Sequence, residues 1–337
     1  MDARRLVIDG TRGAPGACIR GIAYAYASAS HSVRDLAERG WLESDPATLE
    51  AFGFDRVHVA VEETPYDLAL TAANRLLDEQ QTDRETVGLL VYAGTPSAMA
   101  FAAASDAHAG AASLCTADRF RYPVTRLQHE LGLESAAVIA LDQLACTTLF
   151  GAIRVARAMM ASEGIERALC VASEFYPAQA GREAVYNCTS DAACALLLDA
   201  SEDADARNRI VGSTTISKGY YWDPEAMREE VIASYFPTAV HAIDRALCDA
   251  GWRREDVDWV IPHNVSTRSW EVLLRLARLP NAKLWAHNIP RRGHALSGDN
   301  FINLRDAIDG GDVRPGQRAL LFAYGYGAHW TALAVEA

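Results

Sequence analysis

One cysteine of this chain stands where a strand is expected to turn into a helix. Cys146 lies in "DQLACTTLF", after the strand-like "SAAVIAL" and before the helix-like "LFGAIRVARAMMASEG". A thiol at a helix N-terminus is close to the positive end of the helix dipole, which favours the thiolate. A sharp strand-to-helix turn also points backbone N–H groups at a developing oxyanion. We interpret Cys146 as a candidate nucleophile that forms a thioester; a buried structural cysteine is the alternative.

Two histidines follow segments that could bring them to this cysteine. His263 comes after the apolar strand "VDWVI" and a proline, and strand ends often carry functional groups in α/β folds. His294 lies in "RRGHALSGDN", between glycines that permit unusual backbone angles. The alternative for each is a loop histidine that only satisfies a hydrogen bond. His287 is a competitor of similar quality, and His329, in "GYGAHW", ranks below it.

Helix and strand patterns recur in the two parts of the chain. Segments 67–94 and 238–264 each read as an amphipathic helix, a polar turn and an apolar strand. Helices expected at 147–161 and roughly 300–309 are each followed by two β-rich runs. The pattern predicts an α/β protein with two similar halves, 1–200 and 201–337, packed on each other. In such a fold Cys146 and His294 face each other across a pseudo-symmetry axis, with His263 at the mouth of the same crevice.

Composition excludes several classes of protein. Of the 337 residues half are hydrophobic, and no run of about 18 apolar residues indicates a membrane span. The seven cysteines show no CxxC pair, which favours reduced thiols and a cytoplasmic location. The net charge of −12 argues against nucleic acid as the main partner. An acidic protein partner would need a local basic patch.

The chain resembles the β-ketoacyl-acyl-carrier-protein synthase III family of the thiolase superfamily over nearly its whole length. "ALDQLACTTLFGAI" is similar to the nucleophile segment of that family, and "VIPHNVSTRSW" to its first histidine segment. The C-terminal stretch from "RRGHALSGDN" to "GYGAHWTALAVE" matches the closing family pattern without gaps. The resemblance implies a five-layered α-β-α-β-α thiolase-like fold and a homodimer. It implies acylation of Cys146, His263 as a catalytic residue, and an oxyanion hole made by the backbone N–H groups of Cys146 and Tyr326.

The chain departs from the family pattern at several places. His294 stands where the family has a catalytic asparagine, so the set Cys146, His263 and His294 resembles that of the elongating ketosynthases. Tyr326 occupies the centre of a turn that is "GGG" in the family. The family residues that hold coenzyme A fall near Ala47 and Ala51, so those contacts are expected to be missing. The segment 97–120 is longer than its family counterpart, and either shapes the acyl tunnel or is a surface insertion.

The resemblance implies a ketosynthase III-like reaction in fatty-acid-like or polyketide secondary metabolism. Cys146 takes an acyl group from an acyl thioester, and a decarboxylative Claisen condensation with a malonyl thioester follows, with His263 and His294 donating hydrogen bonds to the malonyl carbonyl. The alternative is transfer of the acyl group to a hydroxyl or amine. No cofactor or metal is expected, because the substrates arrive as acyl carrier protein or coenzyme A thioesters. Arg268, Arg291 and Arg292 could dock a carrier protein or a phosphopantetheine phosphate, or could form a solvated charge cluster.

Overall fold

The computed structural model describes residues 16–94, 101, 120–176, 180–201, 206–224, 226–280 and 282–337. Most of the segment 97–120 therefore lies outside the described residues, and its expected role stays a prediction.

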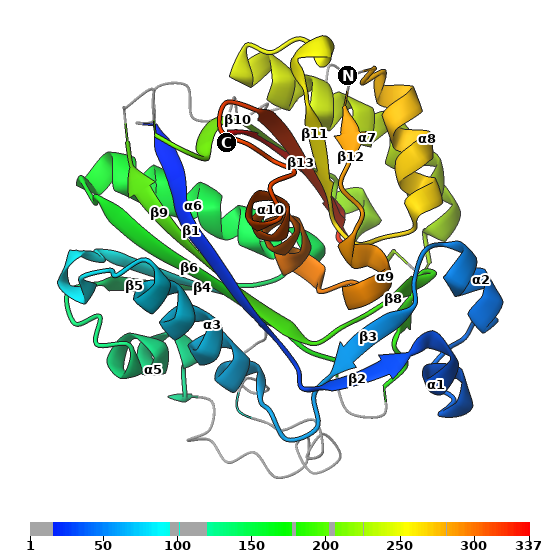
Figure 1. Ribbon diagram of the computed structural model, residues 1–337, viewed down its shortest axis with the longest axis horizontal. Coiled ribbons are helices and arrows are strands. Elements are labelled where there is room, and N and C mark those ends of the chain that lie inside the picture. The colour runs from blue at the N-terminus through cyan, green and yellow to red at the C-terminus, as the bar shows by residue number, and fades with distance from the viewer. Residues whose placement is uncertain are drawn as a thin grey trace.

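Ten strands of the described residues form one continuous sheet that consists of two halves with the same strand order (Figure 1). The first half runs β5-β4-β6-β9-β1, and the second half runs β12-β11-β13-β14-β10. In each half the first three strands are parallel and the last two are antiparallel to their neighbours. These strands are β1 (Ala17–Tyr26), β4 (Leu89–Gly94), β5 (Ala137–Leu141), β6 (Arg167–Glu174), β9 (Ala192–Ala200), β10 (Arg209–Ser217), β11 (Trp259–Pro262), β12 (Lys283–Leu284), β13 (Arg318–Gly325) and β14 (His329–Glu336).

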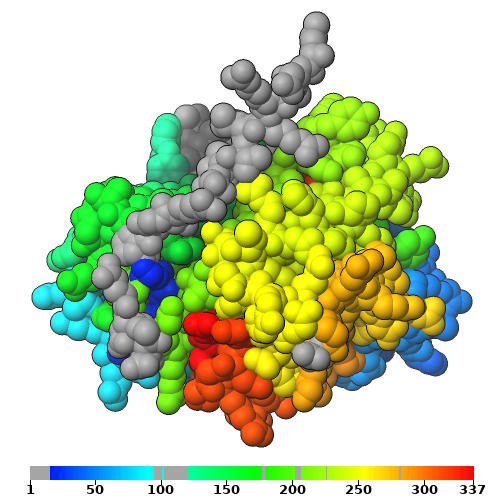
Figure 2. Space-filling view, turned by 90° about the horizontal axis from the view of Figure 1, so that it is seen from above, coloured from blue at the N-terminus to red at the C-terminus, as the bar shows by residue number. Residues whose placement is uncertain are grey.

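The two halves join where β1 and β10 pair for a short distance. Their paired residues are Ala17 with Ile210 and Cys18 with Arg209. Figure 2 shows this end of the molecule, where the red C-terminal residues lie beside the yellow region around residue 250. Ala17, Ala250 and Glu336 line one shallow hollow there.

Helices cover both halves of the sheet and fill the space between them. The outer layers contain α3 (Pro65–Glu79) on the first half, and α7 (Arg228–Ala250) with α8 (Thr267–Ala277) on the second. The middle layer contains α6 (Thr148–Glu163) and α10 (Asp299–Asp309), which share one apolar core with both halves of the sheet. The stack confirms the predicted five-layered thiolase-like architecture. Smaller elements are β2 (Ala29–Ser32), β3 (Arg56–Val59), β7 (Glu183–Ala184), β8 (Asn187–Cys188), α1 (Val33–Glu38), α2 (Pro46–Ala51), α5 (Pro123–Glu130) and α9 (Asn288–Arg292).

Local sequence signals explain where the main helices begin and end. Thr64 and Asp67 form a reciprocal capping box at the start of α3, with Pro65 in its first turn. Gly164 ends α6 and Gly251 ends α7, each in the left-handed conformation that glycine adopts at low cost. The helices expected at 147–161 and about 300–309 are α6 and α10, with boundaries shifted by one or two residues.

Both middle-layer helices follow the same kind of turn. A short 3-10 helix, η4 (Ala145–Thr147), precedes α6, and another, η7 (Leu296–Gly298), precedes α10. The first residue of each turn has a positive φ, 46° at Ala145 and 50° at Leu296. This likeness makes Ser297 the counterpart of Cys146 in the second half. The boundary at residue 200 between two similar halves remains a proposal.

None of the helices in the described ranges combines the length and the apolar character that crossing a bilayer needs.

Candidate active site

Cys146 lies in the η4 turn at the entrance of α6 and is partly exposed. The end of β13 packs tightly against this turn, at Gly325. A Cβ atom on Gly325 would lie 2.5 Å from the Leu144 carbonyl oxygen and 3.2 Å from the Cys146 nitrogen. Glycine is therefore required here, because any side chain would push the strand away from the Cys146 amide. Tyr326 follows directly, and its predicted N–H contribution to an oxyanion hole stays a prediction.

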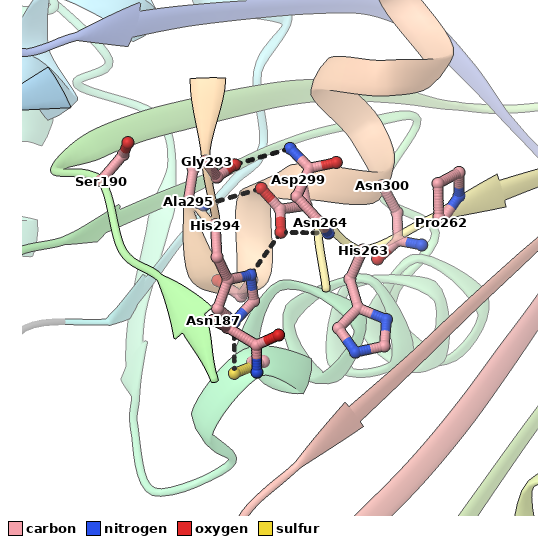
Figure 3. Close-up of polar contacts among 12 residues, drawn as sticks. Asn187, Ser190, Pro262, His263, Asn264, Gly293, His294, Ala295, Asp299 and Asn300 are labelled. Carbon is pink, nitrogen blue, oxygen red and sulfur yellow. Dashed lines mark hydrogen bonds and ion pairs between the residues drawn. The ribbon is translucent and has the colours of Figure 1, made fainter. Parts of the chain in front are cut away.

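The imidazole of His294 connects the Cys146 thiol to a buried carboxylate. His294 Nε2 lies 3.2 Å from Cys146 Sγ, and His294 Nδ1 lies 2.5 Å from Asp299 Oδ2 (Figure 3). His294 is 3% exposed and Asp299 is fully buried, so the contact is shielded from water. Thiol, imidazole and carboxylate thus stand in one line, an arrangement that activates nucleophiles on unrelated folds.

Asp299 is held in place by backbone groups as well as by His294. The Asn264 N–H donates to Oδ2 at 2.7 Å, and the Ala295 N–H donates to Oδ1 at 2.7 Å. Asn264 is thereby tied to the same carboxylate as His294, although it comes from the other histidine segment. Its side-chain amide donates to the Gly293 carbonyl at 2.8 Å, which joins the two segments a second time.

Gly293 allows the chain to approach its neighbours closely just before His294. Its φ is +61°, and a Cβ atom there would lie 2.8 Å from the Cys188 carbonyl oxygen. The His294 N–H donates to that same carbonyl at 2.7 Å, and the Ser190 N–H donates to the His294 carbonyl at 2.9 Å. The backbone on both sides of the imidazole is therefore fixed, and the ring keeps its position between Cys146 and Asp299.

The charges of Cys146 and Asp299 favour a protonated His294. Burial by itself would lower the pKa of His294, but the charges of Cys146 and Asp299 outweigh it and raise that pKa well above its ordinary value. A cationic imidazole donates from both ring nitrogens, so it can bond Asp299 and stabilise a thiolate on Cys146 together. An imidazolium beside a thiol is an arrangement that can activate sulfur as a nucleophile.

His263 lies beside His294 but has the opposite electrostatic character. The two ring centres are 5.9 Å apart. Burial and the charge of His294 together lower the pKa of His263 to about 3, so the ring is neutral at physiological pH. Because Nδ1 lies 3.2 Å from the Phe322 carbonyl oxygen, it must carry the proton. The remaining nitrogen, Nε2, is therefore a hydrogen-bond acceptor and a potential base.

Buried amides keep the His263 segment rigid. The Trp270 indole N–H donates to the His263 carbonyl at 3.0 Å, and Asn303 Nδ2 donates to the Pro262 carbonyl at 2.8 Å. Asn300 Nδ2 donates to the Phe322 carbonyl at 2.9 Å, the same oxygen that His263 contacts. Asn303 of α10 thus fixes the end of β11 directly before His263, and Asn300 fixes the carbonyl that His263 contacts.

Glu174 is a further carboxyl group close to this site. It ends β6, and its Oε1 accepts a hydrogen bond from Ser297 Oγ at 2.6 Å. Burial raises the pKa of Glu174 to about 7, while the bond from Ser297 and the charge of His294 oppose that rise. Ser297 is part of the turn between His294 and Asp299, so Glu174 anchors the loop that carries both.

The structure brings Cys146 and His294 into contact, with His263 at the side of His294. The other histidine candidates do not contact Cys146. His287 precedes α9 and lies beside Trp285, with ring centres 5.1 Å apart. His329 of β14 lies near the cysteine segment, because its ring contacts the backbone of Gln143, and its Nδ1 lies 2.8 Å from Ser217 Oγ.

The three predicted docking arginines do not form a single free cluster. Arg268 is exposed and lies over the Phe52 ring at 5.8 Å, beside α2, which carries Ala47 and Ala51. Arg291 turns back to its own helix and donates to the His287 carbonyl at 3.0 Å. Arg292 stacks on Tyr26 at 4.8 Å. Of the three, Arg268 is the one whose guanidinium faces the surface near α2.

Sequence reasoning missed Asp299, Glu174 and the backbone role of Asn264. One signal for Asp299 was available, since it stands five residues after His294 at the start of an expected helix. A carboxylate there interacts favourably with the helix dipole and can reach back to a preceding side chain. Glu174 and Ser297 gave no signal, because their contact joins segments 123 residues apart.

Two family models match the chain, and together they span about half of it. One describes 3-oxoacyl-[acyl-carrier-protein] synthase III and matches residues 142–219, and the other describes its C-terminal part and matches residues 247–337. The first match begins at the cysteine segment, and the second contains both His263 and His294.

Similar proteins agree with these matches. A β-ketoacyl-[acyl-carrier-protein] synthase III of Salmonella arizonae is 24% identical over 310 residues, which cover 85% of this chain and 89% of that protein. The structure of an acyltransferase covers 96% of this chain and 98% of its own, with a TM-score of 0.78 and 19% identity. The priming β-ketosynthase of a polyketide pathway covers 95% and 96%, with a TM-score of 0.74 and 18% identity.

At these identities the two structures establish the fold alone, and the family models establish family membership. The chain therefore belongs to the 3-oxoacyl-[acyl-carrier-protein] synthase III family of ketosynthase III-like enzymes.

Proposed function

We propose that this protein transfers an acyl group from a thioester to Cys146 and then condenses it with a malonyl thioester, with loss of carbon dioxide. The observation that carries the proposal is the line from Cys146 through His294 to Asp299, with neutral His263 beside it. Membership of the synthase III family favours condensation over other acyl transfers. The structural likeness to a priming β-ketosynthase is consistent with a role in polyketide or fatty-acid-like synthesis.

In the first half-reaction the Cys146 thiolate attacks the thioester carbonyl carbon. The tetrahedral oxyanion forms beside the backbone N–H of Cys146, at the entrance of a helix. The C–S bond of the donor then breaks, and the departing thiolate takes the Nε2 proton of His294. Cys146 is now a thioester, and His294 is neutral.

In the second half-reaction His294 acts as a hydrogen-bond donor. Its raised pKa favours uptake of a proton from solvent once the first thiol has left. The malonyl carboxylate leaves as carbon dioxide, and the enolate that remains is stabilised by the Nε2–H of His294. The enolate carbon attacks the acyl carbon and the Cys146 thiolate departs beside the imidazolium. One proton is consumed per cycle, which balances the loss of carbon dioxide from a carboxylate.

This assignment differs from the expectation that both histidines donate to the malonyl carbonyl. The Nδ1–H of His263 is taken by the Phe322 carbonyl, and its Nε2 carries a lone pair. His294 is therefore the donor, and His263 is an acceptor. The acceptor character of His263 is also the observation that favours the second candidate function, because transfer to a hydroxyl or amine needs a base.

One experiment separates the two functions. Enzyme pre-acylated on Cys146 is mixed with labelled malonyl thioester, and released gas and product mass are both followed. Condensation predicts labelled carbon dioxide and a product lengthened by two carbons. Discharge of the acyl group by a hydroxylated or amine acceptor, with no gas from a range of malonyl donors, would establish transfer instead.

We further propose that the acyl donor is a carrier protein and that the enzyme acts as a homodimer in the cytoplasm. Ala47 and Ala51 on α2 offer no aromatic or basic contact for a nucleotide, whereas Arg268 beside them is exposed. The outer edge of β5 has no strand partner among the described residues and offers a surface for a second copy. The described cysteines are free thiols, which suits a reducing compartment.

A further inference from the structure

A cavity lies between α6, β10 and α7, and we call it the α6–β10–α7 cavity. Its volume is about 890 Å³, which is in the range of small-molecule sites. Phe150 lines it, one helical turn after Cys146 on α6. Cys146, His263 and His294 do not line it, so the cavity is separate from the proposed catalytic site.

The α6–β10–α7 cavity is strongly basic. Five basic side chains line it, and no aspartate or glutamate is among its described lining residues. They are Arg154 and Arg157 of α6, Lys218 after β10, and His241 and Arg245 of α7. In a protein whose net charge is −12, such a concentration of positive charge indicates an anionic ligand.

Arg157 is a basic residue of this cavity whose burial is energetically unfavourable. Its Nε atom is buried and has no hydrogen-bond partner within the described part of the chain. Burial lowers the pKa of Arg157, and the charge of Asp249 offsets only part of that effect. A buried guanidinium without a paired acid destabilises the fold unless another anion compensates it.

The corresponding place on the first half of the sheet, between α10, β1 and α3, contains an arginine with two acids. Arg305 of α10 occupies the position equivalent to Arg154, counted from the turns that precede both helices. Its guanidinium binds Asp309 at 2.5 Å and Glu79 of α3 at 2.9 Å, and it also donates to the Ile22 carbonyl of β1. Arg154 is therefore the counterpart of an arginine that is fully paired.

A small residue replaces one of those acids. Ala158 stands where Asp309 stands, four residues after the arginine. Glu79 corresponds to Asp249 of α7, because Gln81 and Gly251, each two residues further on, both have a positive φ. Asp249 accepts a hydrogen bond from the Ser213 N–H at 2.9 Å. The arginine has thus been kept while the carboxylate partner on its own helix is absent.

The volume of the cavity also comes from a difference between the two halves of the sheet. The strand register shifts between Ile19 and Gly21 in β1 and between Ile210 and Gly212 in β10, so these residues align the two strands. Tyr24 and Tyr26 of β1 then correspond to Thr215 and Ser217 of β10, both of which line the cavity. Two aromatic rings that fill the first half are replaced by short side chains in the second.

We propose that the α6–β10–α7 cavity binds a phosphate-bearing small molecule of nucleotide size. The guanidinium forks of Arg154, Arg157 and Arg245 suit phosphate oxygens, which they can bind in pairs. Tyr220 and Tyr221 supply aromatic faces in the same cavity, and Tyr220 is 66% exposed, so a planar ring of the ligand can stack there. This site does not depend on the proposed reaction at Cys146.

Calorimetric titration of the intact protein tests the proposal, with ATP and inorganic pyrophosphate as separate probes. Wild-type protein should bind both, and ATP more tightly because its base adds stacking. Arg154→Gln and Arg157→Gln should each weaken binding at least about tenfold, since each removes charge-assisted hydrogen bonds. Arg275→Gln, on the exposed side of α8, is the matched control and should leave binding unchanged. Thermal melts verify that each variant is folded.

A second pair of variants tests the comparison between the halves. Ala158→Asp restores a carboxylate four residues after Arg154, as Asp309 stands after Arg305, and should weaken ATP binding. Ser162→Asp adds the same charge on α6 without that spacing and should have little effect. Absence of pyrophosphate and ATP binding to wild type, or equal weakening by both aspartates, would overturn the proposal. Citrate binding as tight as that of ATP would overturn the assignment to phosphate.

Discussion

The two histidines of the site differ in their electrostatic surroundings, and we propose that this difference gives them different steps. His294 contacts Cys146 and Asp299 and holds a positive charge, whereas His263 is neutral with its Nδ1–H donated to a carbonyl. Pairs of titratable groups whose environments separate their pKa values commonly divide donor and acceptor roles.

Alanine variants of the two histidines should therefore affect different half-reactions. His294→Ala should slow acylation of Cys146 by roughly a hundred-fold or more, because it removes the cation that supports the thiolate. It should slow malonyl decarboxylation by a similar factor. His263→Ala should leave acylation within a few-fold of wild type. Single-turnover acylation and gas release measure the two steps, and equal losses in acylation for both variants would contradict the division of roles.

The raised pKa of Glu174 predicts that the free energy of unfolding depends on pH. A carboxyl group with a raised pKa is neutral in the folded protein and charged in the unfolded chain, so its burial destabilises the protein as pH rises from about 4.5 to about 7. Glu174→Gln keeps an acceptor for Ser297 and removes that penalty. The variant should be more stable than wild type at pH 8, by up to about 3 kcal/mol, and nearly equal at pH 4.5.

Urea unfolding at several pH values measures this effect. Glu163→Gln, at the exposed end of α6, is the control and should show no such dependence. A gain at pH 8 no larger than the gain at pH 4.5 would show that Glu174 is not held neutral by burial.

At the scale of elements, the β5 edge is the surface on which the dimer proposal depends. Ala137 and Ala140 on this strand are exposed, and β4 is its one strand neighbour in the described sheet. An exposed strand edge readily pairs with another chain. Ala140→Lys should convert a dimer to monomers, because a charge on the edge strand opposes pairing.

Light scattering after gel filtration measures the mass of each variant. Val272→Lys, an equally charged change on exposed α8, should leave the dimer intact. A dimer that persists in Ala140→Lys would place the interface on another face.

Elements were easier to predict from the sequence than the contacts between them. The α6 and α10 helices could be located because apolar periodicity and terminal glycine signals are local properties. The contact between Cys146 and His294 was expected from the recurring pattern, but Asp299 was not, because its role depends on the Asn264 amide from another segment. The protonation of His263 also required the position of Phe322, which no local pattern contains.

At the scale of the whole molecule, the net charge of −12 opposes an acidic carrier protein. Docking therefore depends on local basic residues, of which Arg268 is exposed beside α2. The proposal predicts faster acylation of Cys146 from a carrier-protein thioester than from the same acyl group on coenzyme A. Arg268→Glu should slow the carrier-protein reaction, and salt should do so too, since exposed charges are screened over about 10 Å at 0.1 M.

Acylation rates with both donors, across a range of salt, test this expectation. Arg275→Glu on the same helix controls for a general change in charge. Faster acylation from coenzyme A, with no effect of Arg268→Glu, would contradict a carrier-protein donor.

The central claim is that Cys146 is the acylated residue and that Asp299 acts on it through His294. Peptide mapping by mass spectrometry after incubation with a panel of acyl thioesters tests it most directly. The acyl adduct should appear on Cys146 and be absent in Cys146→Ala. In Asp299→Asn its rate of formation should fall by roughly a hundred-fold or more, because the carboxylate that keeps His294 charged is lost. Asp309→Asn, at the exposed end of α10, should acylate at a rate close to that of wild type. An adduct on Cys188 or Cys194 with none on Cys146, or an undiminished rate in Asp299→Asn, would contradict the account.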